Sequence, residues 1–523
     1  PYSAPRQPWP PLLRERAASE LPARVLERLA SAPPEEVVQC ACGVFPDIRR
    51  AWVTVDNTLY LWRFDARGAE RCAPVEYSEE QVICAVALAP PAPGVFIQAV
   101  KRLLVLATPV EIVLLGVCTT GGADGLEELA LQPLPLYAIP SDTVAMRCVT
   151  ATAAGRIFMG GHDGHLYELV YTAGTRWRER RVRKVCHSAT LSSYLPSFMT
   201  LSAPDPIVEI AVDEPRGILY TRSAASGLVV YDLGEAGDRC AKVAECADAR
   251  HAARLSRSTK LLGLQPLSGA ASEEVQLATT TTDGTRVFWT VLQRSYGTVA
   301  GAAASTKARR PSCLRFVASR EAPPPPRASS TGTGGAFDSV GGDLARGVGS
   351  GAIQVQCAML TEAEAIFAGP APGGQARLMV AARDWTLGQQ AGAAARQQRA
   401  RGLRELIAEV PAASAVLGVS RVPASEETAT LVEPLAARGA VGGATGASTV
   451  AAAAARAAAL PELVSQHALP RRQVVVVTQT GVRLFERMRP IDTLAALLEA
   501  GDMAGVRAFF GDYGQAEACA MCL

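Results

Sequence analysis

The chain has 523 residues, and its 52 basic and 50 acidic side chains leave a net charge of only +2, which gives no support for nucleic-acid binding. Its 13 cysteines are scattered without regular spacing, which argues against a disulfide framework and favours reduced thiols in a cytosolic or nuclear setting. No run approaches the roughly 18 apolar residues of a membrane-spanning helix, so we expect any membrane association to be peripheral.

Residues 1–35 are predicted to form a tail and one short helix. Prolines crowd the first 11 positions, and residues 12–29 are compatible with a helix that Pro22 would interrupt or restart. We therefore expect this segment to lead into the main domain.

A short phrase then recurs along most of the chain, in which a small or polar residue and a turn residue precede an apolar strand. Asn-Gly-like and Asp-Gly pairs tolerate the positive φ angles of two-residue turns, so each copy predicts a β-hairpin. The clearest copies lie at 55–62, 161–169, 225–233, 282–289 and 479–485, and weaker ones at 103–115 and 377–385.

The spacing of these hairpins predicts a repeated unit. The expected turns lie at positions 57, 109, 164, 227, 284, 384 and 481, and the first four intervals run from 52 to 63 residues. One four-stranded propeller blade with its loops has about this length. The two longer intervals contain Gly-, Ala- and Pro-rich stretches at 297–351 and 387–470, which we interpret as inserted loops, with a possible helix at 401–407. The fold class is thus predicted as mainly β, a seven-bladed β-propeller over 36–487; stacked sandwiches are the alternative.

The apolar period changes after residue 487. Pro490 occupies a first helical position, and a helical pattern follows it until Gly501. Two further helices are expected before Leu523. Residues 488–523 are therefore predicted to start an α-solenoid, and we expect the protein to continue beyond them as stacked helices.

Catalytic chemistry is poorly represented. The sequence has five histidines, and two of them, His162 and His165, flank a predicted tight turn where a solvent-exposed loop is favoured over a metal site. Cys519 and Cys522 have zinc-like spacing but no second pair, so packing cysteines are favoured. We expect no enzyme activity, no cofactor and no metal.

Two basic segments are candidates for contact with other surfaces. Residues 240–267 could form an amphipathic helix on a membrane, although a helix packed on the rim of the propeller is the alternative. Its candidate contact residues are Leu255, Leu261, Leu262, Leu264, Arg254 and Arg257. The run from Arg176 to Lys184 is interpreted as an exposed edge strand with protective charges, the alternative being contact with an acidic partner or lipid headgroups.

Six phrases in order resemble the large inner-ring scaffold nucleoporins of the nuclear pore complex, the 155/170-kDa family. The resemblance covers roughly 36–290 and 470–523. The phrases lie at 52–62, 103–112, 155–168, 218–223, 489–492 and 515–523.

This resemblance implies a seven-bladed propeller followed by an α-solenoid, in a non-enzymatic scaffold at the nuclear envelope that contributes to pore assembly and nucleocytoplasmic transport. It also implies that inner-ring scaffold and linker nucleoporins are partners, and that the pore membrane is contacted peripherally by a propeller loop whose place residues 240–267 occupy. The alternative is a propeller-solenoid adaptor of a vesicle coat or another large assembly. The phrases at 489–492 and 515–523 favour the nucleoporin.

Overall fold

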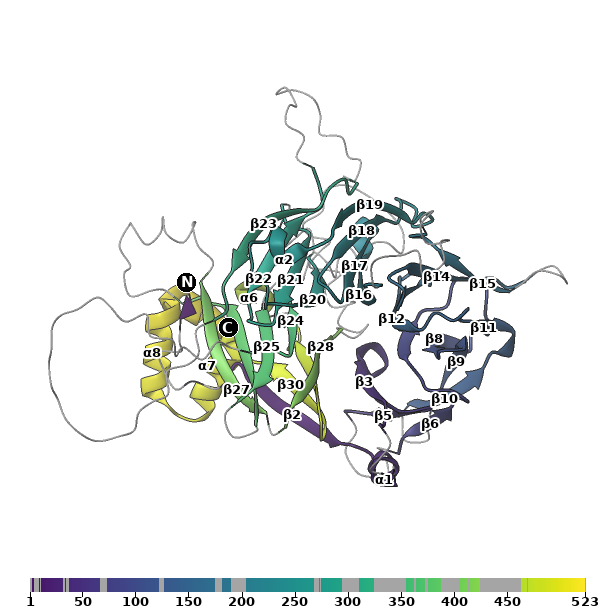
Figure 1. Ribbon diagram of the computed structural model, residues 1–523. Coiled ribbons are helices and arrows are strands. Elements are labelled where there is room, and N and C mark those ends of the chain that lie inside the picture. The colour runs from purple at the N-terminus through teal and green to yellow at the C-terminus, as the bar shows by residue number, and fades with distance from the viewer. Residues whose placement is uncertain are drawn as a thin grey trace.

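The fold of the chain is seen in a computed structural model (Figure 1). It describes residues 2–3, 9, 11–31, 33, 37–65, 73–121, 127–174, 181–189, 204–267, 272, 274–293, 310–323, 354–361, 364–371, 375–386, 404–412, 414–423, 462–467 and 469–522. Within these ranges, every helix is too short or too polar to cross a membrane.

The strands form seven four-stranded antiparallel sheets, two of which carry one additional short strand. Blade 1 consists of β3 (Cys40–Phe45), β4 (Arg50–Val55), β5 (Thr58–Arg63) and β6 (Val75–Ser78). Blade 2 consists of β7 (Ala85–Ala89), β8 (Val100–Ala107), β9 (Glu111–Gly121) and β10 (Glu127–Pro133), with β11 (Ile139–Pro140) paired to β9. Blade 3 consists of β12 (Met146–Ala151), β13 (Ile157–Gly161), β14 (Leu166–Tyr171) and β15 (Val182–Cys186). Blade 4 consists of β16 (Ile207–Asp213), β17 (Ile218–Ser223), β18 (Leu228–Asp232) and β19 (Ala241–Cys246). Blade 5 consists of β20 (Leu261–Pro266), β21 (Leu277–Thr281), β22 (Arg286–Thr290) and β23 (Arg315–Arg320).

Blades 6 and 7 combine strands from both ends of the chain. Blade 6 consists of β24 (Cys357–Leu360), β25 (Glu364–Pro370), β26 (Ala376–Arg383) and β27 (Glu405–Ala412), with β1 (Tyr2–Ser3) parallel to β27. Blade 7 consists of β28 (Val416–Val422), β29 (Gln473–Thr478), β30 (Gly481–Arg487) and β2 (Leu13–Glu20). The predicted seven-bladed propeller is therefore confirmed.

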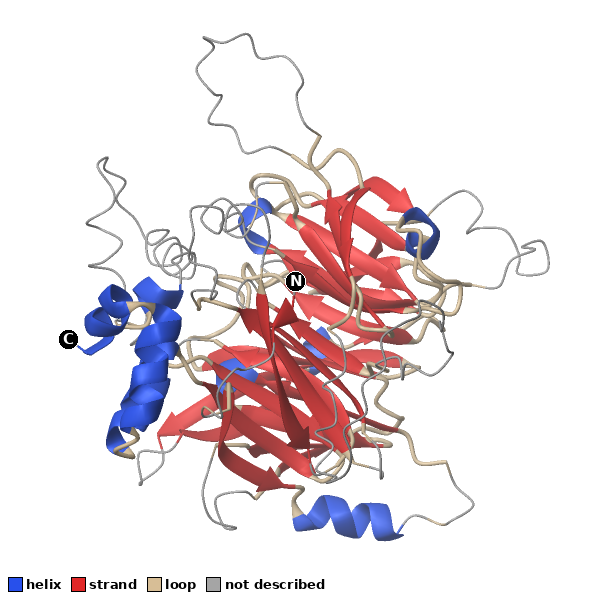
Figure 2. Cartoon of the chain, turned by 90° about the vertical axis from the view of Figure 1, so that its left-hand side faces the viewer, coloured by secondary structure: helices blue, strands red, loops and turns tan. Residues whose placement is uncertain are grey.

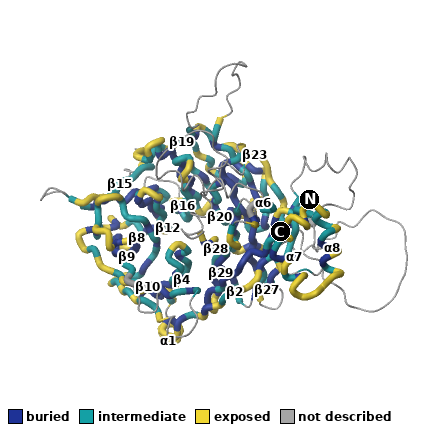
Figure 3. Tube along the Cα trace, turned by 180° about the vertical axis from the view of Figure 1, so that it is seen from behind, coloured by how far each residue is buried: buried dark blue, intermediate teal, exposed yellow. Residues whose placement is uncertain are grey.

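The blades are joined by apolar cores that complete a circle. Seven clusters of buried apolar side chains each span one pair of adjacent blades, from blades 1 and 2 round to blades 7 and 1. The innermost strands β12, β16, β20, β24, β28 and β3 follow one another around the centre (Figure 1), and β7 contacts β12. The buried positions accordingly concentrate inside the blades, while exposed positions lie on loops, on outer strands and on helices such as α1 (Figure 3). Each blade is thus supported on both sides by its neighbours.

The N-terminal segment closes this circle, which corrects the expectation of a tail and short helix over residues 1–35. Strand β2 is the outermost strand of blade 7 and pairs antiparallel with β30, from Leu13 opposite Arg487 to Glu20 opposite Gly481 (Figure 1). The sequence of β2 is compatible with a helix, but the edge of β30 offers backbone groups that only an extended strand can pair. The predicted short helix is α1 (Ala23–Ser31), which follows β2.

One glycine makes this close pairing possible. Gly481 has φ +150°, and a Cβ atom there would lie 2.2 Å from the carbonyl oxygen of Ser19 in β2. The absence of a side chain at Gly481 therefore permits both the turn between β29 and β30 and the close approach of β2 that closes the ring.

Most hairpin turns lie where the sequence places them, between the second and third strands of a blade. The turn expected at position 384 is the exception, because Asp384 follows β26, the third strand of blade 6. The segments interpreted as inserts also contain blade strands: β23 lies within 297–351, and β27 and β28 lie within 387–470. The possible helix at 401–407 is wrong over its described part, because β27 starts at Glu405 and pairs along β26.

A buried ion pair joins blades 5 and 6. The guanidinium of Arg286 donates to both carboxylate oxygens of Glu405, at 2.9 and 2.6 Å, and to the hydroxyl of Tyr2 at 3.0 Å. The side chains of Arg286 and Glu405 are only 4% and 6% exposed. Burial lowers the pKa of Arg286, but its bonds to Glu405 outweigh this effect and raise it overall. The first strand of the chain thus meets a charged pair that is closed off from solvent.

Three helices follow blade 7, as predicted: α7 (Pro490–Glu499), α8 (Met503–Tyr513) and α9 (Gln515–Cys522). They pack on one another at one side of the propeller (Figure 2). Pro490 occupies the first turn of α7, and Gly501, with φ +66°, follows its end. Two four-residue helices, α2 (Ala249–Ala252) and α6 (Glu462–Ser465), and the 3-10 turns Pro46–Ile48, Pro135–Tyr137 and Glu214–Arg216 lie in connections.

Candidate functional site

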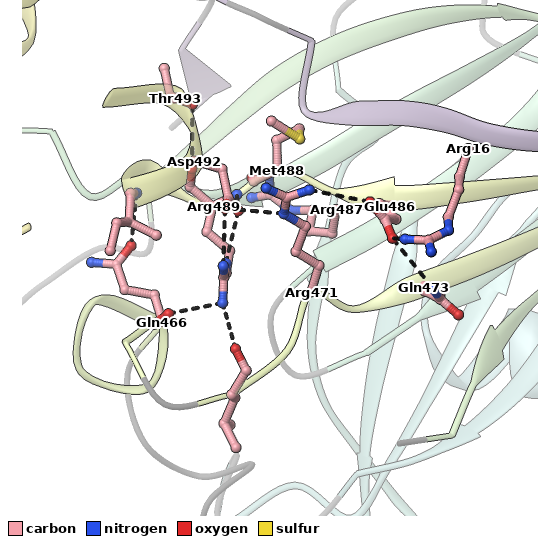
Figure 4. A network of polar contacts seen from close by, with 12 residues as sticks. Arg16, Gln466, Arg471, Gln473, Glu486, Arg487, Met488, Arg489, Asp492 and Thr493 are labelled. Atoms are coloured by element: carbon pink, nitrogen blue, oxygen red, sulfur yellow. Dashed lines mark hydrogen bonds and ion pairs between the residues drawn. The ribbon is translucent and has the colours of Figure 1, made fainter. Parts of the chain in front are cut away.

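The junction between blade 7 and the helices is held by charged side chains (Figure 4). The guanidinium of Arg489 donates to both carboxylate oxygens of Asp492, at 2.8 and 2.9 Å. The same carboxylate accepts the backbone N–H of Arg489 at 3.0 Å, so it also caps the first turn of α7. Arg489 further donates to the carbonyl of Gln466 at 2.8 Å. The start of α7 is thereby fixed to the connection between β28 and β29 of blade 7.

The network continues into the closing strand. Arg471 bridges two carboxylates, at 3.1 Å from Asp492 and 3.4 Å from Glu486. Glu486 lies on β30 and also pairs with Arg16 of β2. Burial raises the pKa of both carboxyl groups, but the surrounding guanidinium groups outweigh it and lower both pKa values. One network of ion pairs therefore joins β2, β30 and α7.

A second, more buried ion pair ties the junction to blade 6. Arg487, at the end of β30, lies 2.9 Å from Glu364 in β25, and the two side chains are 6% and 2% exposed. The same arginine lies 3.9 Å from Glu462 in α6, whose carboxylate accepts a hydrogen bond from the indole N–H of Trp385 at 3.2 Å. Buried charges of this kind require exact partners, so they restrict the arrangement of the elements that carry them.

An aromatic contact adds the N-terminal segment to the helices. The ring of Trp9 lies 5.6 Å from that of Phe509 and 6.1 Å from that of Tyr513, both on α8. Phe509 is fully buried in the core that the three helices share. Local sequence patterns do not predict this contact, because Trp9 and α8 lie about 500 positions apart in the chain. The polar network and Trp9 make the propeller and the helices one structural unit.

We expect the substitution Asp492→Asn to destabilise this junction by about 2 kcal/mol at neutral pH, because hydrogen bonds to a charged group contribute about that much. The pKa of Asp492 is lowered by folding, so its contribution is present above the unfolded pKa and is lost as the pH falls through the folded pKa. The difference in unfolding free energy between wild type and variant should therefore shrink in acid. Hydrogen exchange of α7 and chemical denaturation at several pH values measure this.

The matched control is Asp502→Asn, at the N-cap of α8. Its carboxylate accepts only the backbone N–H of Gly505, at 2.9 Å, and the side chain is exposed. Little loss is expected there, because asparagine caps the N-terminus of a helix about as well as aspartate. Equal losses in the two variants would contradict a special role for Asp492.

A cavity of about 650 Å³ lies among the inner strands of blades 4 to 7. Three carboxylates line it, and each already has a partner. Glu209 pairs with Arg222 at 2.8 Å, Asp213 pairs with Arg216 at 2.6 Å, and Glu214 accepts the backbone N–H of Ala153 at 2.7 Å. Burial raises the pKa of all three carboxyl groups. Each of these three carboxylates is therefore engaged in the structure of the blades.

The histidine turn of blade 3 is likewise structural. The carboxylate of Asp163 accepts the backbone N–H of His165 at 3.1 Å and the hydroxyl of Tyr167 at 2.5 Å. The imidazole of His165 contacts the hydroxyl of Ser188 at 3.1 Å. Across the residues that the structure describes, no three metal-ligating side chains converge.

The candidate membrane residues do not form the expected amphipathic helix over 240–267. That range contains β19, the four-residue α2 and β20. Leu261 and Leu264 are 2% and 6% exposed in the core between blades 4 and 5, because a β-bulge after Leu261 turns both side chains inward. Leu262 packs against the core between blades 5 and 6. The prediction that these three leucines contact a membrane is therefore wrong, because their side chains pack in the cores between blades.

The remaining candidates lie in the connection between α2 and β20, here named the basic loop (residues 253–260). Leu255 is partly buried against the core, while Arg254 and Arg257 are exposed. Lys260, which was not among the predicted contact residues, is also exposed in this loop. The basic run from Arg176 to Lys184 is described only from Arg181 onward, where β15 forms the outer edge of blade 3 as expected.

Comparison with known proteins relates the chain to components of the nuclear pore. Residues 9–333 match the family model described as Nup133 N terminal like. The chain is 33% identical over 280 residues to the nuclear pore complex protein Nup154 of Drosophila melanogaster, covering 50% of this chain and 20% of that protein. It is 31% identical over 330 residues to the nucleoporin NUP170 of Chaetomium thermophilum, covering 60% of this chain and 22% of that protein.

A solved structure supports the fold. The chain is similar, with a TM-score of 0.72 and 21% identity, to the N-terminal domain of Chaetomium thermophilum Nup170 crystallised in a complex with Nup53. The likeness covers 100% of this chain and 69% of that chain. The chain spans only about a fifth of the length of the two curated relatives.

Proposed function

The chain belongs to the Nup133 N-terminal-like family of nucleoporins, and from this premise we propose that it is a structural scaffold component of the inner ring of the nuclear pore complex. It acts there without catalysis, at the nuclear envelope, in pore assembly and nucleocytoplasmic transport. The observation that carries the proposal is the family match together with a closed propeller whose junction holds the helices in one orientation. A vesicle-coat adaptor is not favoured, because the relatives are nuclear pore proteins.

Linker nucleoporins are the partners that we propose first. The solved relative was crystallised with Nup53, and its fold is similar to that of the present chain. We expect the chain to bind the Nup53 of its own organism and to concentrate at the nuclear rim. Purified proteins in a pull-down, and fluorescence microscopy of the tagged chain, measure these results. A chain that binds no inner-ring nucleoporin and stays diffuse in the cell would overturn the proposal.

We also propose that the basic loop contacts the pore membrane through electrostatic attraction. Arg254 and Arg257 are exposed, and neither forms an ion pair with any carboxylate that the structure describes, so both are free to meet anionic headgroups. Each basic side chain near an anionic surface contributes about 1 kcal/mol. No nucleic-acid contact is proposed, in keeping with the balanced charge of the chain.

The double substitution Arg254→Ala/Arg257→Ala is expected to weaken binding to anionic vesicles by about 2 kcal/mol, a factor of about 30. Cosedimentation with vesicles at several salt concentrations measures it, and the binding of wild type should fall as salt rises. The matched control is Lys101→Ala/Arg507→Ala, which removes two exposed charges elsewhere. Equal binding by the two double variants would argue against the basic loop as the contact.

A further inference from the structure

The basic loop presents two serine hydroxyls to solvent. Ala253 and Thr259 are 4% and 5% exposed and anchor the two ends of the loop. The residues between them are exposed except for the partly buried Leu255. The hydroxyls of Ser256 and Ser258 lie 2.9 Å apart, and the hydroxyl of Ser256 also accepts the backbone N–H of Ser258 at 3.4 Å; neither has another side-chain partner among the residues that the structure describes. The hydroxyl of Thr259 is buried and donates to Asp283 at 3.3 Å. Only the two serines are therefore accessible to another protein.

Positive charge surrounds Ser256. Arg254 precedes it by two positions and Arg257 follows it directly. The guanidinium of Arg250 is held over the same loop, because it donates to the carbonyl of Arg257 at 3.4 Å. Arg250 is paired with Asp248, but Arg254, Arg257 and Lys260 have no carboxylate partner among the residues that the structure describes. An exposed serine among unpaired arginines complements the acidic substrate groove of an arginine-directed kinase.

We propose that Ser256 is a phosphorylation site for an arginine-directed serine kinase. In the transfer, the Ser256 hydroxyl oxygen forms a bond to the γ-phosphorus of ATP, the bond from that phosphorus to the β,γ-bridging oxygen breaks, and ADP leaves. The hydroxyl proton passes to the base of the kinase and then to solvent. The phosphate has Arg254 and Arg257 beside it in the sequence and the guanidinium of Arg250 over the same loop.

Phosphorylation of Ser256 would weaken the binding of the basic loop to anionic lipid. A phosphoserine adds a charge of about −1.5 to −2 and pairs readily with guanidinium groups. It therefore cancels the charge of Arg254 and Arg257, the two groups through which we propose that the loop meets anionic lipid. This consequence, although not the site itself, rests on the proposed membrane contact.

The site is tested on the whole folded chain with ATP and a kinase that recognises arginine two positions before serine. Mass spectrometry should place one phosphate on Ser256, and Ser256→Ala should lose most of the incorporated phosphate. Ser258→Ala is the matched control and should keep it, because it removes the neighbouring hydroxyl of the same loop. A proline-directed kinase should leave the loop unmodified, since Arg257 follows the serine. Phosphate on Ser258 alone, or only after heat denaturation of the chain, would overturn the proposal.

The consequence is tested with vesicles that contain phosphatidylserine and with neutral vesicles. Phosphorylated wild type should bind the anionic vesicles at least about tenfold more weakly than unmodified protein, while Ser256→Ala treated with kinase should bind as before. Equal binding of phosphorylated and unmodified protein would refute the switch. If unmodified protein binds neither vesicle, the membrane contact itself is refuted, whereas the mass measurement still decides the phosphorylation site.

Discussion

A chain that lacks residues 1–20 is expected to lose the cooperative unfolding of the intact propeller. The truncation removes β2, so the outer edge of β30 loses its partner from Arg487 to Gly481. It also removes Leu13, which is 2% exposed in the core between blades 6 and 7. Burial of one leucine contributes about 2 kcal/mol, and each lost ladder hydrogen bond adds about 1 kcal/mol. The cost therefore exceeds that of a typical point substitution, and it falls on blade 7, whose outermost strand comes from the N-terminal end of the chain.

Hydrogen exchange and thermal unfolding measure this result. The amides of β30 should exchange much faster in the truncated chain than in the intact one. Because an extended peptide can add to an open sheet edge, a peptide of residues 9–22 supplied in trans should restore protection. The same peptide with Leu13→Asp should not restore it. A truncated chain that keeps both the melting temperature and the protection of β30 would show that β2 is dispensable for closure.

The substitution Glu405→Ala is expected to cost about 3–5 kcal/mol of unfolding free energy, because removing one partner of a buried ion pair leaves an uncompensated charge. Arg286 would remain buried with Tyr2 as its remaining hydrogen-bond partner. Its Nε atom already has no hydrogen-bond partner in the structure. Burial would then disfavour the charged guanidinium, and the interface between blades 5 and 6 would have to open to hydrate it.

Denaturant titration of three variants isolates the effect. Arg286→Met/Glu405→Leu should recover most of the stability that Glu405→Ala loses, because it removes the buried guanidinium together with its carboxylate. Arg320, which lies 3.2 Å from Glu405, loses this ion pair in both variants, but its side chain is 20% exposed and can be hydrated. The control is Glu245→Ala, which breaks the pair with Lys242, where the side chains are 52% and 43% exposed. That loss should stay below about 1 kcal/mol. A loss for Glu405→Ala as small as the loss for Glu245→Ala would show that the buried pair is unimportant for stability.

Local patterns in the sequence predicted the repeated part of the fold. A two-residue turn between apolar strands needs only a few adjacent residues, so copies such as Asp56-Asn57 and Asp283-Gly284 were recognisable wherever they occurred. The start of α7 at Pro490 was recognisable for the same reason. Their spacing then determined the number of blades, and the family resemblance, which the comparisons confirm, agreed with it.

The same local reasoning was wrong where a partner distant in the chain decides the structure. The segment 13–20 is compatible with a helix, but it pairs as a strand with the edge of β30. The segment 401–407 was predicted as a possible helix, but β27 pairs along β26 there and places Glu405 against Arg286. The spacing of Leu261 and Leu264 suggested the apolar face of a helix, but a β-bulge produces the same spacing on one side of a strand. In each case the local sequence was compatible with both a helix and a strand, and contact with a neighbouring strand stabilised the strand.

The sequence by itself therefore determined the hairpins, their number and the place where helices take over from strands, because turn chemistry and apolar periodicity act over a few residues. Only the tertiary structure decided how the ring is closed, which charges are buried, and which residues of the basic loop meet solvent. Ring closure depends on pairing residues 13–20 with residues 481–487. The pairing stabilises the fold only after these two distant segments have been brought together. Neither segment alone therefore shows a sequence pattern that predicts it.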